Sequence, residues 1–334
     1  MHVQVTVRPP GAPDEELLGL LARATESDGH PALPDPLWSA LTHPGPDSPS
    51  VLLAHAGPDL AGCAFVTPPA TASTDHVAAV HLVVDPAHRS DSEDAAVRHA
   101  LLEQATDQVA PTQPMRLWAL GATAADDAVA ARHGFAPERD LLQMRVPLPL
   151  PEAIRAGARP VQTRPFRPGR DEEGWLDVNN RAFAGHPEQG GWTLAQLRER
   201  LAADWVDLDG FLMADAAPNG LRDGADGAAD PGLLGSCWTK VHRTTRPVLG
   251  EIYVISVDLE HHSQGWGQAL TVAGLDWLAA QGITHGMLYT DAANAAAVTL
   301  YHALGFTDHH VDRAYLRPAA AADPASATAD RQSD

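Results

Sequence analysis

A glycine pair in the second half of the chain has the spacing of an anion-binding loop. Gly265 and Gly267 lie in the segment 262–268, which follows a run of β-branched and apolar residues at 250–258. Glycine lets the backbone adopt conformations closed to other residues and lets a ligand approach closely. If a helix begins here, successive N–H groups point into one concavity at its positive end, which suits a diphosphate. Taken alone, the pair favours a glycine-rich turn that binds nothing.

The elements that must position this loop follow from the pattern of apolar residues. After Gly267, apolar residues recur with the spacing of one helix face, and Gly282 is a suitable end for that helix. The other segments alternate between strand-like and helix-like patterns. The expected order is strand, helix, strand, helix and strand, over residues 250–258, 267–281, 285–289, 294–303 and 311–316. Elements in this order predict an α/β (α+β) fold, with a mixed, twisted sheet flanked by helices.

A weak internal repeat extends this prediction to the whole chain. The interval from Gly62 to Gly235 is the same as that from Asp85 to Asp258, and the Gly-Phe pairs at 134–135 and 305–306 are separated by nearly the same interval. Three anchors in one order at nearly one offset favour a duplication over a coincidence of common dipeptides. We therefore expect two tandem domains, at residues 1–147 and 163–318, joined by a proline-rich linker at 148–162. We also expect a mobile surface loop at 216–232 and a disordered tail at 319–334.

The loop and a second segment resemble the GNAT superfamily of acetyltransferases. The family loop reads Arg/Gln-x-x-Gly-x-Gly/Ala after a buried strand, and residues 294–306 match its Asn-x-x-Ala-x-x-x-Tyr-x-x-x-Gly-Phe helix. The resemblance implies that acetyl-CoA is the co-substrate and that no metal is needed. It implies cofactor contacts from a strand, the loop and the second helix, namely Ile255, Ser256 and Val257, then His262, Ser263, Gln264, Gly265, Trp266, Gly267 and Gln268, then Asn294, Ala295, Ala296, Ala297, Val298 and Thr299.

Two positions depart from the family pattern. His262 stands where the family usually has Gln or Arg, and Thr299 lacks the positive charge often found there. Because the backbone N–H of the loop matters more than this side chain, we expect cofactor binding to be weakened and not abolished.

The first half carries the same strand but a different loop. Residues 86–95 contain no glycine, and three acids at 91, 93 and 94 stand where a diphosphate would lie. Like charges repel there, and the helix at 121–133 lacks a counterpart of Tyr301. We expect this half to have a structural or substrate-lid role and not to bind CoA productively. Whether it retains a bound CoA stays open, and its candidate contacts are Leu82, Val83 and Val84.

A turn at 187–192, Pro-Glu-Gln-Gly-Gly-Trp, places Glu188 on a glycine-flanked loop. It is either a binding loop or a helix-to-helix turn with a solvated acid. Together with the segments 238–242 and 250–254, it resembles the mycothiol synthase family within the superfamily, well over 163–316 and only in outline over the first half. The resemblance implies acetylation of the cysteinyl amine of cysteinyl-glucosaminyl-inositol. It implies substrate contacts from Asp35, where the family typically has Glu, and from Glu188, Lys240, Glu251 and Tyr289.

The chemistry of amide formation from a thioester gives two of these positions a catalytic interpretation. An α-amine has a pKa of about 7.7–8.0, so a modest base suffices at neutral pH. Glu251 is the candidate base and Tyr301 the candidate acid for the departing thiolate, with backbone N–H groups near Ile255 holding the oxyanion. The alternatives are a strand-end surface acid and a core aromatic residue. Cys237 has no triad partner in the pattern and is predicted to be a packed core thiol.

Composition limits the remaining possibilities. A formal net charge of −20 excludes a nucleic-acid partner and argues against an anionic membrane surface, since both need clustered Lys and Arg. Two cysteines form no disulfide framework, and no signal peptide or membrane span is predicted. We expect a cytoplasmic monomer without a metal site. The alternatives are another GNAT enzyme, acting on an aminoglycoside or a protein N-terminus, and a non-catalytic CoA-binding module.

Overall fold

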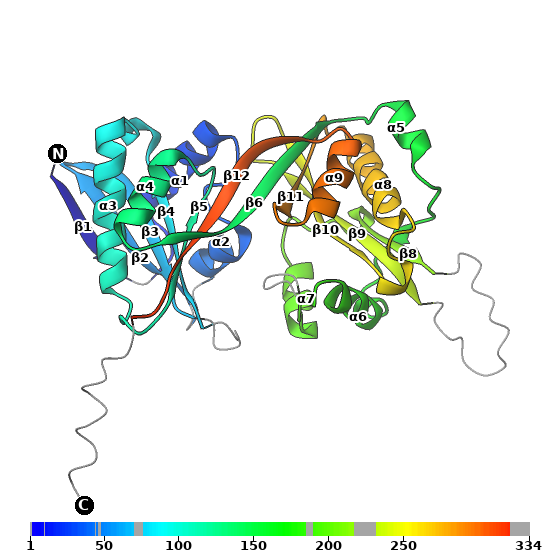
Figure 1. The fold of residues 1–334 in the computed structure, drawn as a ribbon, viewed down its shortest axis with the longest axis horizontal. Helices are drawn as coiled ribbons and strands as arrows, with labels where there is room; N and C mark the ends of the chain where they lie inside the picture. The colour runs from blue at the N-terminus through cyan, green and yellow to red at the C-terminus, as the bar shows by residue number, and fades with distance from the viewer. Residues whose placement is uncertain are drawn as a thin grey trace, which may run out of the picture. The chain divides into compact units, whose positions relative to one another are not determined.

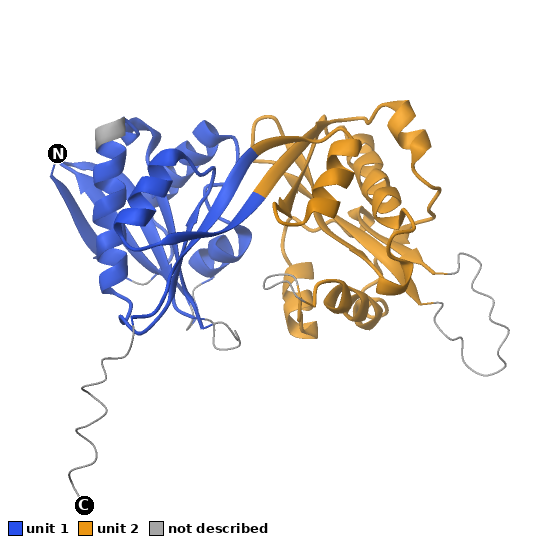
Figure 2. Ribbon diagram, in the orientation of Figure 1, with its two compact units in different colours: residues 1–141, 310–334 blue, residues 142–309 orange. Residues whose placement is uncertain are grey.

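The computed structural model describes residues 2–9, 11–43, 45, 48–69, 76–184, 190–216 and 232–320. The chain forms two compact units, which are residues 1–141 with 310–334 and residues 142–309 (Figure 2). The loop predicted at 216–232 and the tail predicted from 319 lie outside the described residues, apart from their ends.

Unit 1 is a three-layer arrangement around a mixed sheet (Figure 1). The strand order is β1 (Val3–Arg8), β2 (Ser50–Ala56), β3 (Asp59–Thr67), β4 (Ala78–Val84), β5 (Met115–Ala119) and β12 (Thr307–Arg317). Helices α3 (Asp91–Asp107) and α4 (Ala124–Arg132) cover one face, and α1 (Glu15–Asp28) and α2 (Asp35–Thr42) cover the other. Among the neighbouring strands of unit 1 whose residue pairing is established, β4 and β5 are parallel and the others are antiparallel. Each face has its own buried apolar cluster.

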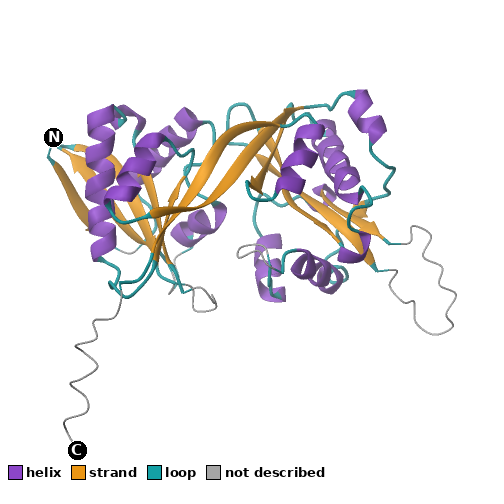
Figure 3. Cartoon of the chain, viewed as in Figure 1, coloured by secondary structure: helices purple, strands orange, loops and turns teal. Residues whose placement is uncertain are grey.

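Unit 2 repeats this plan (Figure 3). Its strand order is β6 (Ala136–Pro147), β11 (His285–Asp291), β10 (Leu249–Val257), β9 (Leu233–His242), β8 (Phe211–Asp215) and β7 (Arg164–Pro165). One face packs against α5 (Glu152–Gly157), α8 (Trp266–Ala280) and α9 (Ala295–Ala303). The other packs an aromatic cluster against α6 (Glu172–Ala182) and α7 (Leu194–Leu201). The strands and helices predicted around the glycine loop are confirmed, with shifts of a few residues at their ends.

The internal repeat is confirmed by equivalent hydrogen bonds in the two units. The N–H of Asp85 donates to the carbonyl of Ala61 (2.9 Å), and the N–H of Asp258 donates to that of Leu234 (2.8 Å), so donor and acceptor are displaced along the chain by the same interval. A Cβ on Gly62 would meet the carbonyl of residue 83 and the side chain of 97, and one on Gly235 would meet their counterparts at 256 and 270. These glycines therefore allow the same close approach of strand and helix in each unit.

The unit boundaries differ from the domains predicted at 1–147 and 163–318. Strand β6 begins in unit 1 and ends in unit 2, whereas β12 begins in unit 2 and ends in unit 1. Each sheet is thus completed by a strand from the other half of the chain. Within the predicted linker 148–162, Leu148 and Leu150 are buried in the core of unit 2, and the N–H of Leu148 donates to the carbonyl of Thr284 (2.8 Å). Prolines prevent a regular ladder there but not apolar packing.

Candidate active site

The glycine loop of unit 2 forms the start of a helix with free N–H groups. Gly265 has a φ of 83° and is the N-cap of α8, with no side-chain cap hydrogen bond, and Ser263 has a φ of 59°. A Cβ on Gly267 would lie 3.8 Å from a methyl of Leu300, so the loop packs beside α9. Because the first N–H groups of a helix have no partner within the helix, this end suits an anion.

The His262 side chain closes the loop instead of facing away from it. Its Nε2 lies 3.0 Å from the carbonyl oxygen of Val257. In unit 1, Nε of Arg89 donates to the carbonyl of Val84 (3.0 Å), which is the equivalent contact in the repeat. A ring nitrogen therefore replaces a guanidinium in the same structural role.

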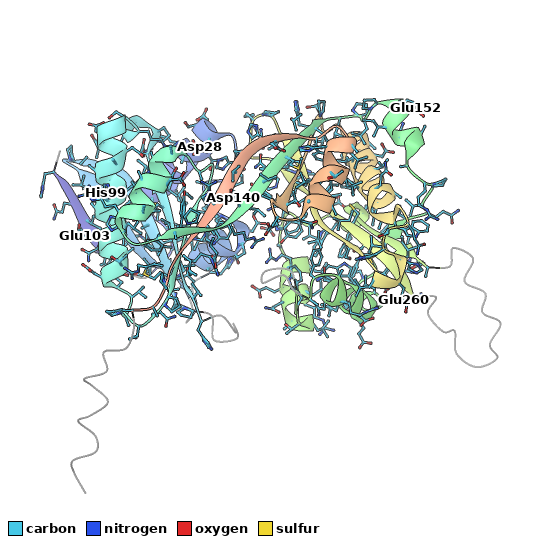
Figure 4. All side chains as sticks on the ribbon, viewed as in Figure 1. Asp28, His99, Glu103, Asp140, Glu152 and Glu260 are labelled. Atoms are coloured by element: carbon cyan, nitrogen blue, oxygen red, sulfur yellow. The ribbon has the colours of Figure 1, made fainter. Side chains whose placement is uncertain are left out.

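The corresponding segment of unit 1 is filled by side-chain partners. Arg89 pairs with Asp28, which Figure 4 labels, and α3 begins at once after Ser90. The Ser90 hydroxyl donates to Glu93 (3.0 Å), and Nε of Arg98 donates to Asp94 (2.7 Å). The predicted contacts Leu82, Val83 and Val84 form the end of β4, where Val83 and Val84 are buried. This segment therefore differs from the glycine loop in having no glycine and in carrying the carboxylates of Glu93 and Asp94 in the first turn of α3.

The second helix of the predicted cleft, α9, has an exposed first turn. Asn294 caps it by accepting the N–H of Ala297 (3.1 Å), and the Thr299 hydroxyl donates to Ala295 (2.7 Å). Residues 294–296 are exposed. The structure thus places Asn294–Thr299 next to the glycine loop, through the packing of Leu300 on Gly267.

Strands β10 and β11 separate along their length. Their parallel ladder holds only the pairs Gly250–Gly286 and Glu251–Met287 in the described chain, and the pairing of β10 with β9 is irregular between Ile252 and Val254. The equivalent ladder of unit 1 has four pairs, from Ala78–Met115 to His81–Trp118. Residues 255–257 of β10 therefore have no ladder partner on β11 within the described chain.

A polar cluster lies at the end of this short ladder. Lys240 is directly opposite Glu251 in the β9–β10 register, and Nε2 of His242 is 2.7 Å from Oε2 of Glu251. Since a carboxylate only accepts, the imidazole N–H donates to it. The side chains are buried, with Glu251 7% exposed and His242 9%. They lie on the sheet face opposite α8, because Gly250 between them faces the side chain of Leu278.

Aromatic and amide groups border the cluster on the same face. The ammonium of Lys240 is 5.0 Å from the ring centroid of Trp205 and 5.8 Å from that of Tyr253. On β11, the hydroxyl of Tyr289 accepts a hydrogen bond from Nε2 of Gln143 (2.8 Å), a fully buried residue of β6. Lys240, Glu251 and Tyr289, all predicted to contact substrate, therefore lie on one face of the sheet.

Tyr301 lies on the other face. It belongs to the apolar cluster of α8 and α9, is 7% exposed and packs edge-on against Phe306 (centroids 5.7 Å apart). Its hydroxyl has no hydrogen-bond partner among the described residues. Burial, and then the nearby Cys237 thiol, raise the pKa of Tyr301 to about 12. Cys237 is fully buried, and burial raises the pKa of its thiol to about 12.

Two predicted substrate contacts are not placed in this site. Glu188 lies outside the described residues, and Asp35 begins α2 of unit 1. The sequence reasoning also missed His242 and Gln143. The period of two along a strand puts His242 on the same face as Lys240, so a signal existed. For Gln143 there was none, because the pairing of β6 with β11 leaves no local pattern. No group of three or more potential metal ligands converges in the described chain.

Known proteins resemble this chain in sequence and in fold. The sequence profile of the Acetyltransferase (GNAT) family matches residues 175–306. Mycothiol acetyltransferase from Thermobispora bispora is 39% identical over 95% of this chain and 100% of its own length. Mycothiol acetyltransferase from Kocuria rhizophila is 38% identical over 90% of this chain and 95% of its own length. The chain belongs to the mycothiol acetyltransferase family.

Solved structures confirm two tandem GNAT domains for this member of the mycothiol acetyltransferase family. A GCN5-related N-acetyltransferase from Sphaerobacter thermophilus superposes with a TM-score of 0.64 at 19% identity, covering 95% of this chain and 97% of that one. A tandem GNAT protein from the clavulanic acid biosynthesis pathway also gives 0.64, at 16% identity, with 96% and 100% covered. The GNAT family match and the mycothiol acetyltransferase relatives show that the chain is an acyltransferase. None of its described helices has the length and apolar character to cross a membrane.

Proposed function

We propose that this protein transfers the acetyl group of acetyl-CoA to the cysteinyl amine of cysteinyl-glucosaminyl-inositol, the last step of mycothiol biosynthesis. The observation that carries the proposal is the buried Lys240–Glu251–His242 cluster at the open end of the β10–β11 ladder. It supports an acceptor site because a paired carboxylate there can bind and deprotonate an amine. The mycothiol acetyltransferases that match nearly the whole chain supply the identity of the acceptor.

The cofactor is proposed to run along the separated strands. Its pantetheine arm would pair with the backbone of Ile255, Ser256 and Val257, where β10 has no β11 partner. Its diphosphate would occupy the helix start at Gly265 and Gly267, with the exposed first turn of α9 beside it. In this arrangement Glu251 would approach a thioester between the strands from one face of the sheet, and Tyr301 from the other.

The first chemical step is attack of the neutral amine on the thioester carbonyl. The C–N bond forms as Glu251, directly or through one water, accepts a proton from the amine. His242 holds the carboxylate in place through its Nε2–H, which leaves the second carboxylate oxygen available. Backbone N–H groups of Ile255–Val257 are proposed to stabilise the oxyanion of the tetrahedral intermediate.

The second step is collapse of that intermediate. The C–S bond breaks, and the hydroxyl of Tyr301 donates its proton to the departing thiolate. A hydroxyl with no partner in the described chain and with a pKa of about 12 is protonated at neutral pH and free to donate. The proton taken by Glu251 returns to solvent, and Tyr301 regains one, so both groups are ready for the next turnover.

Substrate recognition is proposed to use the polar face next to the base. The polar side chains of Lys240 and Tyr289 would line the site of the hydroxyl-rich pseudodisaccharide, and the aromatic rings of Trp205 and Tyr253 form an apolar border. Glu188 and Asp35 remain proposed contacts on the strength of the sequence resemblance alone.

The deciding experiment compares acceptors. Purified protein and acetyl-CoA are incubated with cysteinyl-glucosaminyl-inositol, with a simple aminoglycoside and with a protein N-terminal peptide, and the CoA thiol released is followed with time. We expect turnover with the first acceptor and an acetylated product by mass spectrometry. Release with another acceptor only would overturn the substrate, and tight CoA binding without any release would favour a non-catalytic module.

A further inference from the structure

The segments proposed to hold acetyl-CoA contain no permanently cationic side chain. Between Arg246 and Arg313 the sequence has no Lys or Arg, whereas it has seven Asp and Glu residues. This stretch includes β10, the glycine loop, α8, β11 and α9. A diphosphate bound there has backbone N–H groups and the helix dipole as partners, but no side-chain charge from these elements.

A cation reaches the glycine loop from a segment before the site. Nη1 of Arg159 donates to the carbonyl oxygen of Gln264 (2.7 Å), and its guanidinium carbon is 3.4 Å from the ring centroid of Trp266. A Cβ on Gly265 would lie 3.7 Å from Cδ of the same arginine. Arg159 therefore contacts residues 264–266 of the loop, where α8 begins.

Arg159 differs from its neighbour Arg155 in charge compensation. Arg155 is held by Asp276 (2.8 Å) and by Glu152 (3.1 Å), the residue labelled on α5 in Figure 4. No carboxylate lies within ion-pair distance of Arg159 in the described chain, and its only hydrogen bond there uses one of five N–H donors. An exposed guanidinium that is oriented by a carbonyl and a ring, but not neutralised, is prepared to bind an anion.

We propose that Arg159 supplies the side-chain charge of the cofactor site by contacting the diphosphate of CoA. The inference rests on the proposed function and adds a residue that the family loop pattern does not contain. It also accounts for His262 in the position of a usual Arg or Gln, since the charge comes from residue 159. A second interpretation is that Arg159 only clamps segment 148–162 onto the loop.

Equilibrium binding of CoA, measured by calorimetry, tests the proposal without turnover. Arg159→Gln keeps a donor for the Gln264 carbonyl but removes the charge, and we expect affinity to fall about 10- to 100-fold, as for a hydrogen bond to a charged group. Arg155→Gln is the matched control, because it removes a neutralised arginine from the same segment, and its affinity should stay within about threefold. Arg159→Lys should give an intermediate loss, since the charge remains without the planar fork.

Two further measurements separate the interpretations. Wild-type affinity should fall more steeply with added salt than that of Arg159→Gln, whereas loss of a clamp leaves the salt dependence unchanged. The loss should be the same with 3′-dephospho-CoA, which retains the diphosphate; a loss confined to CoA would move the contact to the 3′-phosphate and overturn the assignment. Wild-type binding with an unaffected Arg159→Gln variant overturns this inference alone. A wild-type protein that does not bind CoA overturns the proposed function as well.

Discussion

Replacing Tyr301 with phenylalanine separates catalysis from packing. The ring fills the apolar layer between α8, α9 and the sheet, and phenylalanine keeps that ring. The hydroxyl makes no hydrogen bond within the described chain, so its removal should change the free energy of unfolding by less than about 1 kcal/mol. If the same hydroxyl donates the proton to the leaving thiolate, kcat should fall while stability does not.

The magnitude of the kinetic effect follows from the surroundings of Tyr301. In water, a phenol of pKa about 10 is a poor acid for a thiolate whose conjugate acid has a pKa of about 8.5. Beside Tyr301, however, burial raises the pKa of the Cys237 thiol to about 12, the value to which the tyrosine itself is raised. Burial would likewise raise the pKa of a CoA thiol bound there and bring it closer to that of the tyrosine. Proton transfer between matched groups contributes about 10²- to 10⁴-fold, so Tyr301→Phe should lower kcat by at least about 10²-fold, or about 2.7 kcal/mol.

The assay is CoA release at saturating acetyl-CoA, together with thermal unfolding of the same preparations. Tyr315→Phe is the matched control, because that buried hydroxyl of unit 1 donates to Asp127 (2.8 Å). Its loss should cost about 1–3 kcal/mol of stability and leave kcat unchanged. A Tyr301→Phe enzyme with kcat within about threefold of wild type, at a rate limited by chemistry, would refute the reasoning.

Three other predictions follow from buried titratable groups. Glu251→Gln should lower kcat/KM at pH 7 by about 10²-fold and recover towards pH 9, where the acceptor amine deprotonates unaided; an equal loss at both pH values contradicts a role as base. His242→Gln retains a donor to Glu251, so we expect a loss below about tenfold, measured in the same assay; a loss equal to that of Glu251→Gln would place the imidazole itself in the proton transfer. Burial lowers the pKa of His81 to about 4, so the unfolded chain takes up the proton first as the pH falls below about 6.5, and stability declines by up to about 3 kcal/mol by pH 4. Thermal unfolding of wild type and His81→Gln between pH 7 and pH 4 checks this, and parallel curves would contradict it.

The parts of the fold that can be predicted from the sequence are those determined by local pattern. The apolar face of the segment after Gly267 predicts a helix, and Leu270 and Leu278 are indeed buried. The exchange of β6 and β12 could not be predicted, because strand pairing depends on partners far apart in the sequence. The burial of Leu148 and Leu150 within the predicted linker 148–162 could not be predicted either, since prolines indicate a break in regular structure but not whether nearby leucines are buried.

The candidate site was predictable to the same degree. The positions of Lys240, Glu251 and Tyr289 on one face follow from strand alternation once the strands are known. The shortness of the β10–β11 ladder is a property of the assembled sheet and has no local signal. Arg159 had no signal in the loop motif, because it contacts the loop from a distant, earlier part of the chain.

The repeat gives a physical reason to assign chemistry to Glu251 and Tyr301. Ala78 of β4 is the counterpart of Glu251 of β10 in the repeat. Ala78 pairs in parallel with Met115 of β5, as Glu251 pairs with Met287 of β11. Ala130 accepts the N–H of Phe135 through its carbonyl (3.0 Å), as Tyr301 accepts that of Phe306 (3.0 Å). Both alanines are buried, so a methyl group satisfies the fold at each position. By contrast, Asp85 and Asp258 keep the same role, each capping a short helix and pairing with an arginine from a preceding helix. Groups that the architecture needs are therefore present in both units. A buried carboxylate needs a partner, which His242 supplies to Glu251, and the Tyr301 hydroxyl makes no hydrogen bond within the described chain. Their presence in unit 2 alone, on opposite faces of the sheet, supports the proposal that both take part in the reaction.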